Sequence, residues 1–197
     1  MKIKRFIGGI LESNGYVIYQ QEEGSCLIID QGYSSKVFIE FVKKHGLKVK
    51  GILLTHYHPD HVGAVTKIKD AFDCPVYMHR CDCDLYRKPV DVYMEDGDII
   101  DLDGESIRVI NTPGHTKGSV CFFSQKSRLA FTGDTIFNVD LGRTDLESGS
   151  EEEMRSSIKD IIDKWGNDIT IYPGHGDGCT MKTVRKINKE FLDIVNS

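Results

Sequence analysis

Strand-like runs open the chain and are separated by polar turns. YVIYQ (16–20) and SCLIID (25–30) are rich in β-branched and aromatic residues, and the polar QEEG between them predicts a β-hairpin. Residues 34–46 then place apolar side chains on one helical face and end at a glycine, which predicts an amphipathic helix. Strand-like and helix-like patterns continue to alternate after that helix, in the runs VKGILL (49–54), 62–72 and PVYMH (75–79).

The second half begins with paired apolar runs around polar turns. This pattern, over residues 96–134, predicts an antiparallel meander. Ser150 and Glu153 then form a capping box ahead of an apolar stripe at helical spacing, which predicts a helix. A strand in ITIYPGHG (169–176) and a final helix over 181–195 complete the pattern.

Helices follow strands in both halves, so two sheets covered by helices would bury the apolar faces. The expected fold class is therefore a layered α/β (α+β) arrangement. No internal repeat, low-complexity tract or linker interrupts the chain, and we expect residues 1–197 to form a single domain.

Composition narrows the classes of function. The chain has 197 residues, 40% apolar and 28% charged, which is typical of a globular protein. The net charge of -5 argues against nucleic acid and anionic membranes as partners. The N-terminal region holds no signal-peptide core, and no run approaches the roughly 20 apolar residues of a membrane span. We therefore expect a cytoplasmic protein whose six cysteines stay reduced.

Histidines gather in THYHPDHVG (55–63). His56 and His58 lie two apart just past a strand, so in extended backbone both imidazoles can face one point. Asp60 and His61 follow a turn set by Pro59 and can face a second point nearby. Imidazole and carboxylate are natural ligands of divalent ions, so this density of ligand-type side chains predicts a metal site.

Three later segments repeat the form of an apolar strand, a glycine and one ligand-type residue. They place His115 in NTPGHTKGS, Asp134 in FTGDT and His175 in YPGHG. Glycine allows a sharp bend and a close approach to an ion. One zinc ion with an open coordination position needs three protein ligands, so the full set of candidates fits two metals with one bridging carboxylate.

This motif set resembles that of the metallo-β-lactamase-fold hydrolases over nearly the whole chain, from about Asn14 to His175. The resemblance implies a four-layer αβ/βα sandwich with the metals at one edge of two packed sheets. It also implies that Asp134 bridges the two metals and that Asp30 supports the metal-binding loop. The remaining ligands divide between a first metal, held by His56, His58 and His115, and a second, held by Asp60, His61 and His175.

Two bound divalent ions would supply a nucleophile at neutral pH, because metal binding lowers the pKa of water to about 7. Asp60 and Asp134 are the expected catalytic carboxylates, and Asp60 can orient the hydroxide by accepting a hydrogen bond. Zinc is the expected ion because it suits imidazole, while iron and manganese also suit this mixed set.

Within the family, the motifs are most similar to hydroxyacylglutathione hydrolases (glyoxalase II), particularly small single-domain relatives. The resemblance implies hydrolysis of a small-molecule thioester. Only 22 residues follow His175, so we expect no counterpart of the additional helical region that grips glutathione in full-length relatives. In GRTDL, Arg143 could pair with a substrate carboxylate or brace the loop through Asp145. Tyr57 and Tyr172 adjoin ligand residues and either line the pocket or pack in the core.

Other functions stay open. Persulfide dioxygenases share the fold and a similar GRTD loop but use a single iron, at positions matching His56, His115 and Asp134. Hydrolysis of another ester, a lactam or a phosphodiester would use the same site. Flavodiiron oxygen reductases fit less well, since they carry glutamate where His58 stands. A binding module without catalysis would be expected to lose ligands, yet the full set is present.

Overall fold

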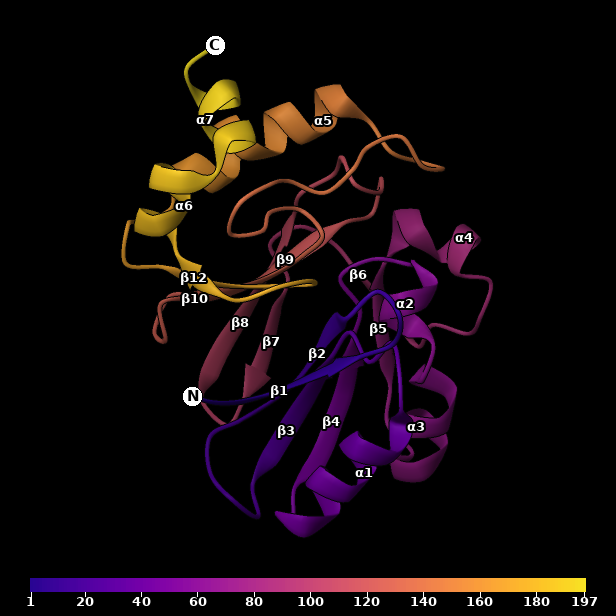
Figure 1. Ribbon diagram of the computed structural model, residues 1–197. Helices are drawn as coiled ribbons and strands as arrows, with labels where there is room; N and C mark the ends of the chain where they lie inside the picture. The colour runs from indigo at the N-terminus through magenta and orange to yellow at the C-terminus, as the bar shows by residue number, and fades with distance from the viewer.

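Two six-stranded sheets form the centre of the fold in the computed structural model, which describes residues 1–197 (Figure 1). The first sheet has the strand order β1 (Lys2–Gly8), β2 (Ser13–Tyr19), β3 (Ser25–Ile29), β4 (Lys48–Leu53), β5 (Val76–His79), β6 (Val92–Met94). The second has the order β12 (Cys179–Thr180), β11 (Thr170–Pro173), β10 (Leu129–Gly133), β9 (Val120–Ser124), β8 (Glu105–Asn111), β7 (Ile99–Leu102).

The first sheet is mixed. The β2–β3 pair is antiparallel, as the hairpin pattern predicts, and β1 adds a further antiparallel strand that the pattern did not predict. From β3 to β6 the strands run parallel, because a helical segment carries the chain back before each new strand. These connections are α1 (Ser35–Lys44), α2 (Pro59–Val62), α3 (Val65–Phe72), η1 (Arg80–Asp82) and α4 (Cys83–Tyr86).

The second sheet confirms the predicted meander, since β7 to β10 pair antiparallel in sequence order. β11 then joins β10 in parallel after a helical crossover. Ser150 caps that crossover, with its Oγ accepting the Glu153 N–H at 3.2 Å. Its own N–H donates to the Gly114 carbonyl and not to the Glu153 side chain, so only half of the predicted capping box forms. The helical turns of the crossover are not uniform: α5 (Glu151–Ser156), a π turn η2 (Ser157–Ile161) and the 3₁₀ turn η3 (Ile162–Lys164) follow one another.

The predicted C-terminal helix is two helices, α6 (Met181–Ile187) and α7 (Lys189–Val195). They separate at Asn188, whose Oδ1 accepts the Phe191 N–H at 2.9 Å and begins the second helix. The same side chain donates to the carbonyls of Phe137 and Asp140, at 3.1 and 2.8 Å. Asn188 therefore links the helix pair to the loop that follows β10. None of the helices combines the length and apolarity needed to cross a bilayer.

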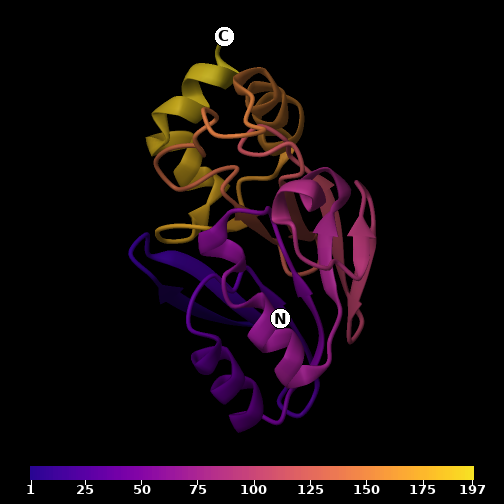
Figure 2. The same cartoon turned by 90° about the vertical axis from the view of Figure 1, so that its right-hand side faces the viewer.

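Three apolar cores separate four layers. Alternate residues of β2 face opposite sides, so Val17 packs toward the helices α1 and α3 while Ile18 packs toward the second sheet. A third core, with Ile158 and Ile171 among its members, lies between the second sheet and the helices α5 to α7. Figures 1 and 2 show these two helix groups at opposite ends of the molecule. The layered α/β prediction is therefore confirmed.

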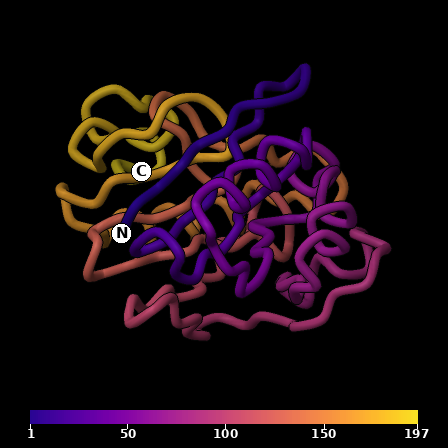
Figure 3. The backbone as a smooth tube through the Cα atoms, turned by 90° about the horizontal axis from the view of Figure 1, so that it is seen from below, coloured from indigo at the N-terminus to yellow at the C-terminus, as the bar shows by residue number.

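The start of β2 lies beside the segment that follows β11. Asn14 N–H donates to the Gly174 carbonyl at 2.6 Å, and Tyr16 O–H donates to the Pro173 carbonyl at 2.6 Å. Figures 2 and 3 show the indigo N-terminal segment beside the gold segment near β12. These bonds join the two sheets at the end where the ligand-type residues lie.

Candidate metal centre

All seven predicted ligands come together at the ends of strands. Those of the first sheet follow β4, where the chain enters the short helix α2. Pro59 begins that helix, and its fixed φ suits the first helical position. The turn separates the ligands before Pro59 from those inside α2. The ligands of the second sheet follow three different strands, β8, β10 and β11, and are His115, Asp134 and His175.

His56, His58 and His115 form a three-histidine set. Their facing nitrogen atoms all lie within 4.8 Å of one another, and His58 Nδ1 lies 2.8 Å from His115 Nε2. His56 is 1% exposed, and its Nε2 has no hydrogen-bond partner. A buried polar atom without a partner costs about 1–3 kcal/mol, so this nitrogen is suited to an ion.

Asp60, His61 and His175 form a carboxylate set beside the first. His61 Nε2 lies 3.4 Å from Asp60 Oδ2 and 3.3 Å from His175 Nε2. His175 Nε2 lies 3.2 Å from Asp60 Oδ2. Three donor atoms of the ligand type required for a divalent ion therefore face one point.

Asp134 lies between the two sets. Its Oδ1 is 3.4 Å from His61 Nε2, and its Oδ2 is 3.5 Å from both His115 Nε2 and His175 Nε2. Asp134 Oδ1 is buried without a hydrogen-bond partner. One carboxylate thus faces both sets, which is the placement that a bridging ligand needs.

Hydrogen bonds at the rear of the rings determine which nitrogen faces the centre. Four rings have their Nδ1 within hydrogen-bond distance of an oxygen outside the ligand set, which leaves Nε2 directed inward. His58 is the exception, because its own Nδ1 faces His115. The four contacts are His56 with Thr55 Oγ1 at 3.0 Å, His61 with Asp30 Oδ2 at 3.2 Å, His115 with the Arg143 carbonyl at 2.7 Å and His175 with the Leu11 carbonyl at 2.9 Å.

Asp30 occupies the position from which it can support the metal-binding loop. Besides contacting His61, its Oδ1 accepts the Thr55 N–H at 2.8 Å and its Oδ2 accepts the Thr55 O–H at 2.6 Å. Asp30 is 2% exposed, so these contacts take place away from water. Thr55, Leu11 and the carbonyl of Arg143 were missed by the sequence reasoning, and no residue-type signal could identify the two carbonyls, since every residue has one.

The two donor sets differ in their electrostatics. Burial lowers the pKa of all three rings in the three-histidine set, that of His58 to about 4. Burial also acts to lower the pKa values of His61 and His175, but the neighbouring carboxylates outweigh it: Asp134, Asp30 and Asp60 at His61, and Asp134 and Asp60 at His175. The pKa of His175 rises to about 9, and that of His61 rises well above its ordinary value. The first set therefore offers neutral imidazoles at pH 7, whereas the second must release protons to bind an ion.

Glycines allow the backbone to pass close to these ligands. A Cβ at Gly142 would lie 1.7 Å from the Asp134 carbonyl oxygen, and one at Gly174 would lie 2.0 Å from Asp134 Oδ1. Gly133 has φ 47, in the left-handed region that favours glycine. Gly133 and Gly174 are the glycines that precede Asp134 and His175 in the sequence, and these close approaches explain their presence there.

The mouth of the centre is a hollow of about 390 Å³ with His115, Asp134, Phe137, Arg143 and His175 in its lining. The Arg143 guanidinium makes two bonds to Asp145, at 2.7 and 2.8 Å, so the side chain of this lining residue braces the loop.

The two tyrosines occupy different environments. Tyr57 donates from its hydroxyl to the Glu147 carbonyl at 2.8 Å and places its ring 4.7 Å from that of His58. Tyr172 packs against Phe131 and Tyr16, with ring centroids 5.3 and 5.9 Å away. It therefore contributes to the core between the sheets, and it is not among the residues that line the hollow.

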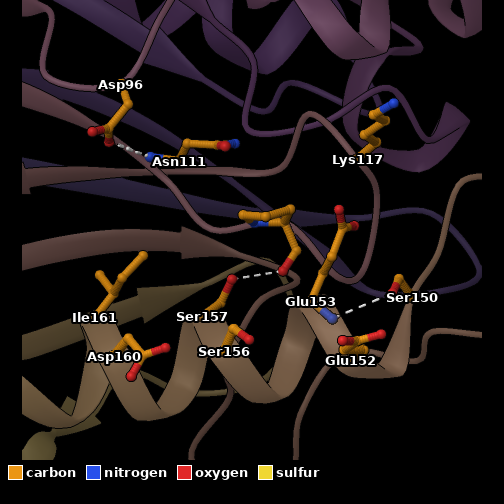
Figure 4. A pocket seen from close by; sticks show the side chains of 11 residues that line it. Asp96, Asn111, Lys117, Ser150, Glu152, Glu153, Ser156, Ser157, Asp160 and Ile161 are labelled. Atoms are coloured by element: carbon orange, nitrogen blue, oxygen red, sulfur yellow. Dashed lines mark hydrogen bonds between the residues drawn. The ribbon is translucent and has the colours of Figure 1, made fainter.

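A larger hollow, of about 820 Å³, lies beside the His115 loop and has Pro113 and Lys117 in its lining (Figure 4). Its polar lining contains no histidine or cysteine. Figure 4 shows that α5 and η2 border it, and Ser157 O–H donates from there to the Pro113 carbonyl at 2.6 Å. Ser150 N–H also donates to the Gly114 carbonyl at 2.8 Å. This region therefore holds the backbone just before His115 in place.

The residues fit two divalent metal ions. Donor nitrogens and carboxylate oxygens converge in two groups, one carboxylate faces both, and two buried donor atoms have no other partner. With metals bound, the site can polarise a carbonyl or phosphoryl oxygen and activate water.

Comparison with known proteins agrees with this geometry. Residues 8–175 match the metallo-beta-lactamase superfamily. A hydroxyacylglutathione hydrolase of Francisella tularensis subsp. novicida is 37% identical over 177 residues, covering 89% of this chain and 68% of that protein. The crystal structure of BLEG-1 B3 metallo-beta-lactamase has a TM-score of 0.90 at 29% identity, with 95% of this chain and 98% of that one covered. TTHA1623 in a di-iron-bound form has a TM-score of 0.84 at 31% identity, covering 94% and 98%. These similarities confirm the fold expected from the motifs.

Proposed function

Because the chain belongs to the metallo-beta-lactamase superfamily, we propose that it is a binuclear metal-dependent hydrolase that cleaves small-molecule thioesters. The observation that carries the proposal is the position of Asp134 between two sets of donors. When bound, two divalent ions supply a water with a pKa near 7 and a positive charge that polarises the acyl carbonyl. Zinc is the expected ion, and the di-iron form of a 31% identical protein supports iron as a second choice.

The chain's own groups suit thioester cleavage. As a metal ligand, Asp60 can also accept a hydrogen bond from the attacking water and so orient it. A thiol has a pKa of about 8.5, so thiolate leaves without a general acid, whereas an amine leaving group needs a proton. The 37% identity to a hydroxyacylglutathione hydrolase favours the same substrate class.

The lining of the mouth favours a thiol carrier other than glutathione. Arg143 is the only Lys or Arg among the lining residues, and Asp145 already pairs with it. Phe137 and Val139 contribute apolar surface, and Asp140 adds a carboxyl group. Glutathione carries two carboxylates and one ammonium group, and the one cationic side chain of this lining is already paired, so we propose a carrier with less negative charge. The protein would act in the cytoplasm on such a thioester, without nucleic acid or membrane as a partner.

The test is a thioester panel assayed with protein of measured metal content. The panel pairs one acyl group with glutathione and with an uncharged thiol. We expect hydrolysis that is lost on chelation, returns with zinc and is faster for the uncharged thiol. Asp134→Ala should abolish both metal bridging and hydrolysis. Protein loaded with two metals but inactive on every thioester would refute the proposal, and one iron per chain with oxygen uptake on glutathione persulfide would replace it with a dioxygenase.

Lactam hydrolysis is the second candidate, favoured by the TM-score of 0.90 to BLEG-1. A chromogenic cephalosporin in the same panel separates the two activities. Turnover of the lactam with no turnover of thioesters would favour this second candidate.

A further inference from the structure

A buried carboxylate outside the ligand set connects two of the metal-binding loops. Asp82 ends the 3₁₀ turn η1 after β5 and is 0% exposed. Its Oδ2 accepts the Tyr57 N–H at 3.2 Å and the Thr116 O–H at 2.8 Å. Its Oδ1 accepts the Gly118 N–H at 2.7 Å. All three partners are hydrogen-bond donors, and no Lys or Arg is among them.

The positions of these donors link Asp82 to the three-histidine set. Tyr57 lies between His56 and His58, so its N–H belongs to the stretch of backbone that directs both rings. Thr116 directly follows His115. A single side chain from a third segment therefore holds both loops that supply the set.

The second loop is shaped to reach this carboxylate. A Cβ at Gly118 would lie 2.5 Å from Asp82 Oδ1, so only glycine allows its N–H to approach this closely. Ser119 Oγ accepts the Thr116 N–H at 3.0 Å and lies 2.8 Å from Thr116 Oγ1. Because Thr116 donates its hydroxyl proton to Asp82, the Ser119 O–H donates to Thr116 Oγ1. The loop thus directs a short chain of hydrogen bonds at Asp82.

We propose that Asp82 is a positioning residue for the three-histidine set. Asp82 accepts hydrogen bonds from both loops and so fixes the position of His56 and His58 relative to His115. This strengthens binding of the metal ion that these rings share. The inference rests on the proposed function only in requiring that the set binds a metal. Asparagine at this position would direct an amide N–H₂ at one group of donors and leave buried N–H groups unsatisfied.

The test measures metal affinity in folded variants. Zinc is titrated against a chromophoric chelator, and cobalt absorption reports the geometry around the ion. Contacts behind metal ligands typically contribute about 10–100-fold in affinity. We expect Asp82→Asn to weaken one of the two binding steps by about that factor and to change the cobalt spectrum. Thr116→Val removes one donor at nearly constant shape and should weaken the same step, whereas Thr116→Ser keeps the donor and should restore it.

Glu105 provides a matched control. It is a carboxylate that is 1% exposed and accepts bonds from Ser124 and Ser127, at the opposite end of β8 from His115. Glu105→Gln should lower stability without altering zinc affinity or the cobalt spectrum. An equal loss of affinity in Glu105→Gln would show that Asp82 acts only through general stability, and would overturn the inference.

Two further outcomes also decide it. Unchanged zinc affinity in Asp82→Asn would overturn the inference. If Asp82→Asn does not fold, unchanged zinc affinity in Thr116→Val would overturn it instead. Failure of every thioester assay would contradict the proposed function but would not alter a measured loss of zinc affinity. The two failures are therefore distinguishable.

Discussion

Replacing Gly174 with alanine tests the bridging role of Asp134 directly. The added Cβ would lie 2.0 Å from Asp134 Oδ1 and 2.6 Å from His61 Cε1. Non-bonded carbon and oxygen atoms do not approach closer than about 3.0 Å, so the carboxylate must move by roughly 1 Å. The added Cβ would also lie 3.1 Å from the Gly133 carbonyl carbon, a further tight contact and one with backbone.

A shift of this size exceeds what a metal centre tolerates. Ligand distances in metal sites hold to within about 0.2 Å, so a carboxylate displaced by about 1 Å can no longer coordinate both ions. We expect Gly174→Ala to lose one of its two metals and about 100-fold in kcat, since a misplacement of about 1 Å in a catalytic group has that effect. Overpacking should also lower the free energy of unfolding by about 1–3 kcal/mol.

Gly176→Ala is the control in the same loop. Gly176 has φ 71 and no atom within 4 Å of an added Cβ, so the variant carries backbone strain of about 1–2 kcal/mol without displacing a ligand. Elemental analysis, thermal unfolding and thioester hydrolysis are measured for both variants. Two metals and an unchanged kcat in Gly174→Ala would refute the steric reasoning, and so would equal metal loss in Gly176→Ala.

Three further predictions concern the same centre. Asp30→Asn replaces the carboxylate that faces His61 and should weaken one metal-binding step by about 10–100-fold, measured by chelator competition. In metal-free protein the pKa of His175 is raised to about 9 and that of His58 lowered to about 4, so between pH 6 and 9 one ion should bind more tightly as pH rises, releasing protons, while the other binds nearly independently of pH. Calorimetry in buffers of different ionisation enthalpy counts these protons, and pH-independent binding of both ions would contradict the asymmetry. Arg143→Ala should leave metal content unchanged in elemental analysis, because the backbone carbonyl and not the guanidinium holds the adjacent ligand ring.

The ligands could be predicted because each depends on residue type. Imidazoles and carboxylates stand out in a chain with only seven histidines, and five of these reach the centre. His45 and His79 do not. His45 lies at the end of α1 against Phe41, and His79 accepts the Cys81 N–H at the start of η1. Neither histidine lies in a segment with the strand-glycine-ligand pattern.

The supporting contacts could not be predicted in the same way. Arg143 was selected for its side chain, yet its carbonyl is the atom that orients His115. Leu11 supplies a carbonyl from the β1–β2 turn, and the pattern did not predict β1. Asp82 is hidden for another reason: its partners come from segments 25 or more residues away, so local sequence contains no sign of them.

The distribution of ligands between the sheets has a thermodynamic consequence. The first sheet supplies His56 and His58 while the second supplies His115, and the carboxylate set is likewise divided, with His175 coming from the second sheet. Each ion would therefore span the interface between the sheets, which is already joined by the bond from Val120 N–H to the Thr55 carbonyl at 3.0 Å.

Because an ion bound across this interface requires both sheets to be in place, binding and folding are coupled. A ligand at 100 times its Kd adds about 2.7 kcal/mol to the free energy of unfolding. Removing the metals should therefore lower the stability of the packed sheets as a unit, and not only that of the loops. An apoprotein whose two sheets unfold at the same temperature as those of the metal-loaded protein would show that neither ion bridges them.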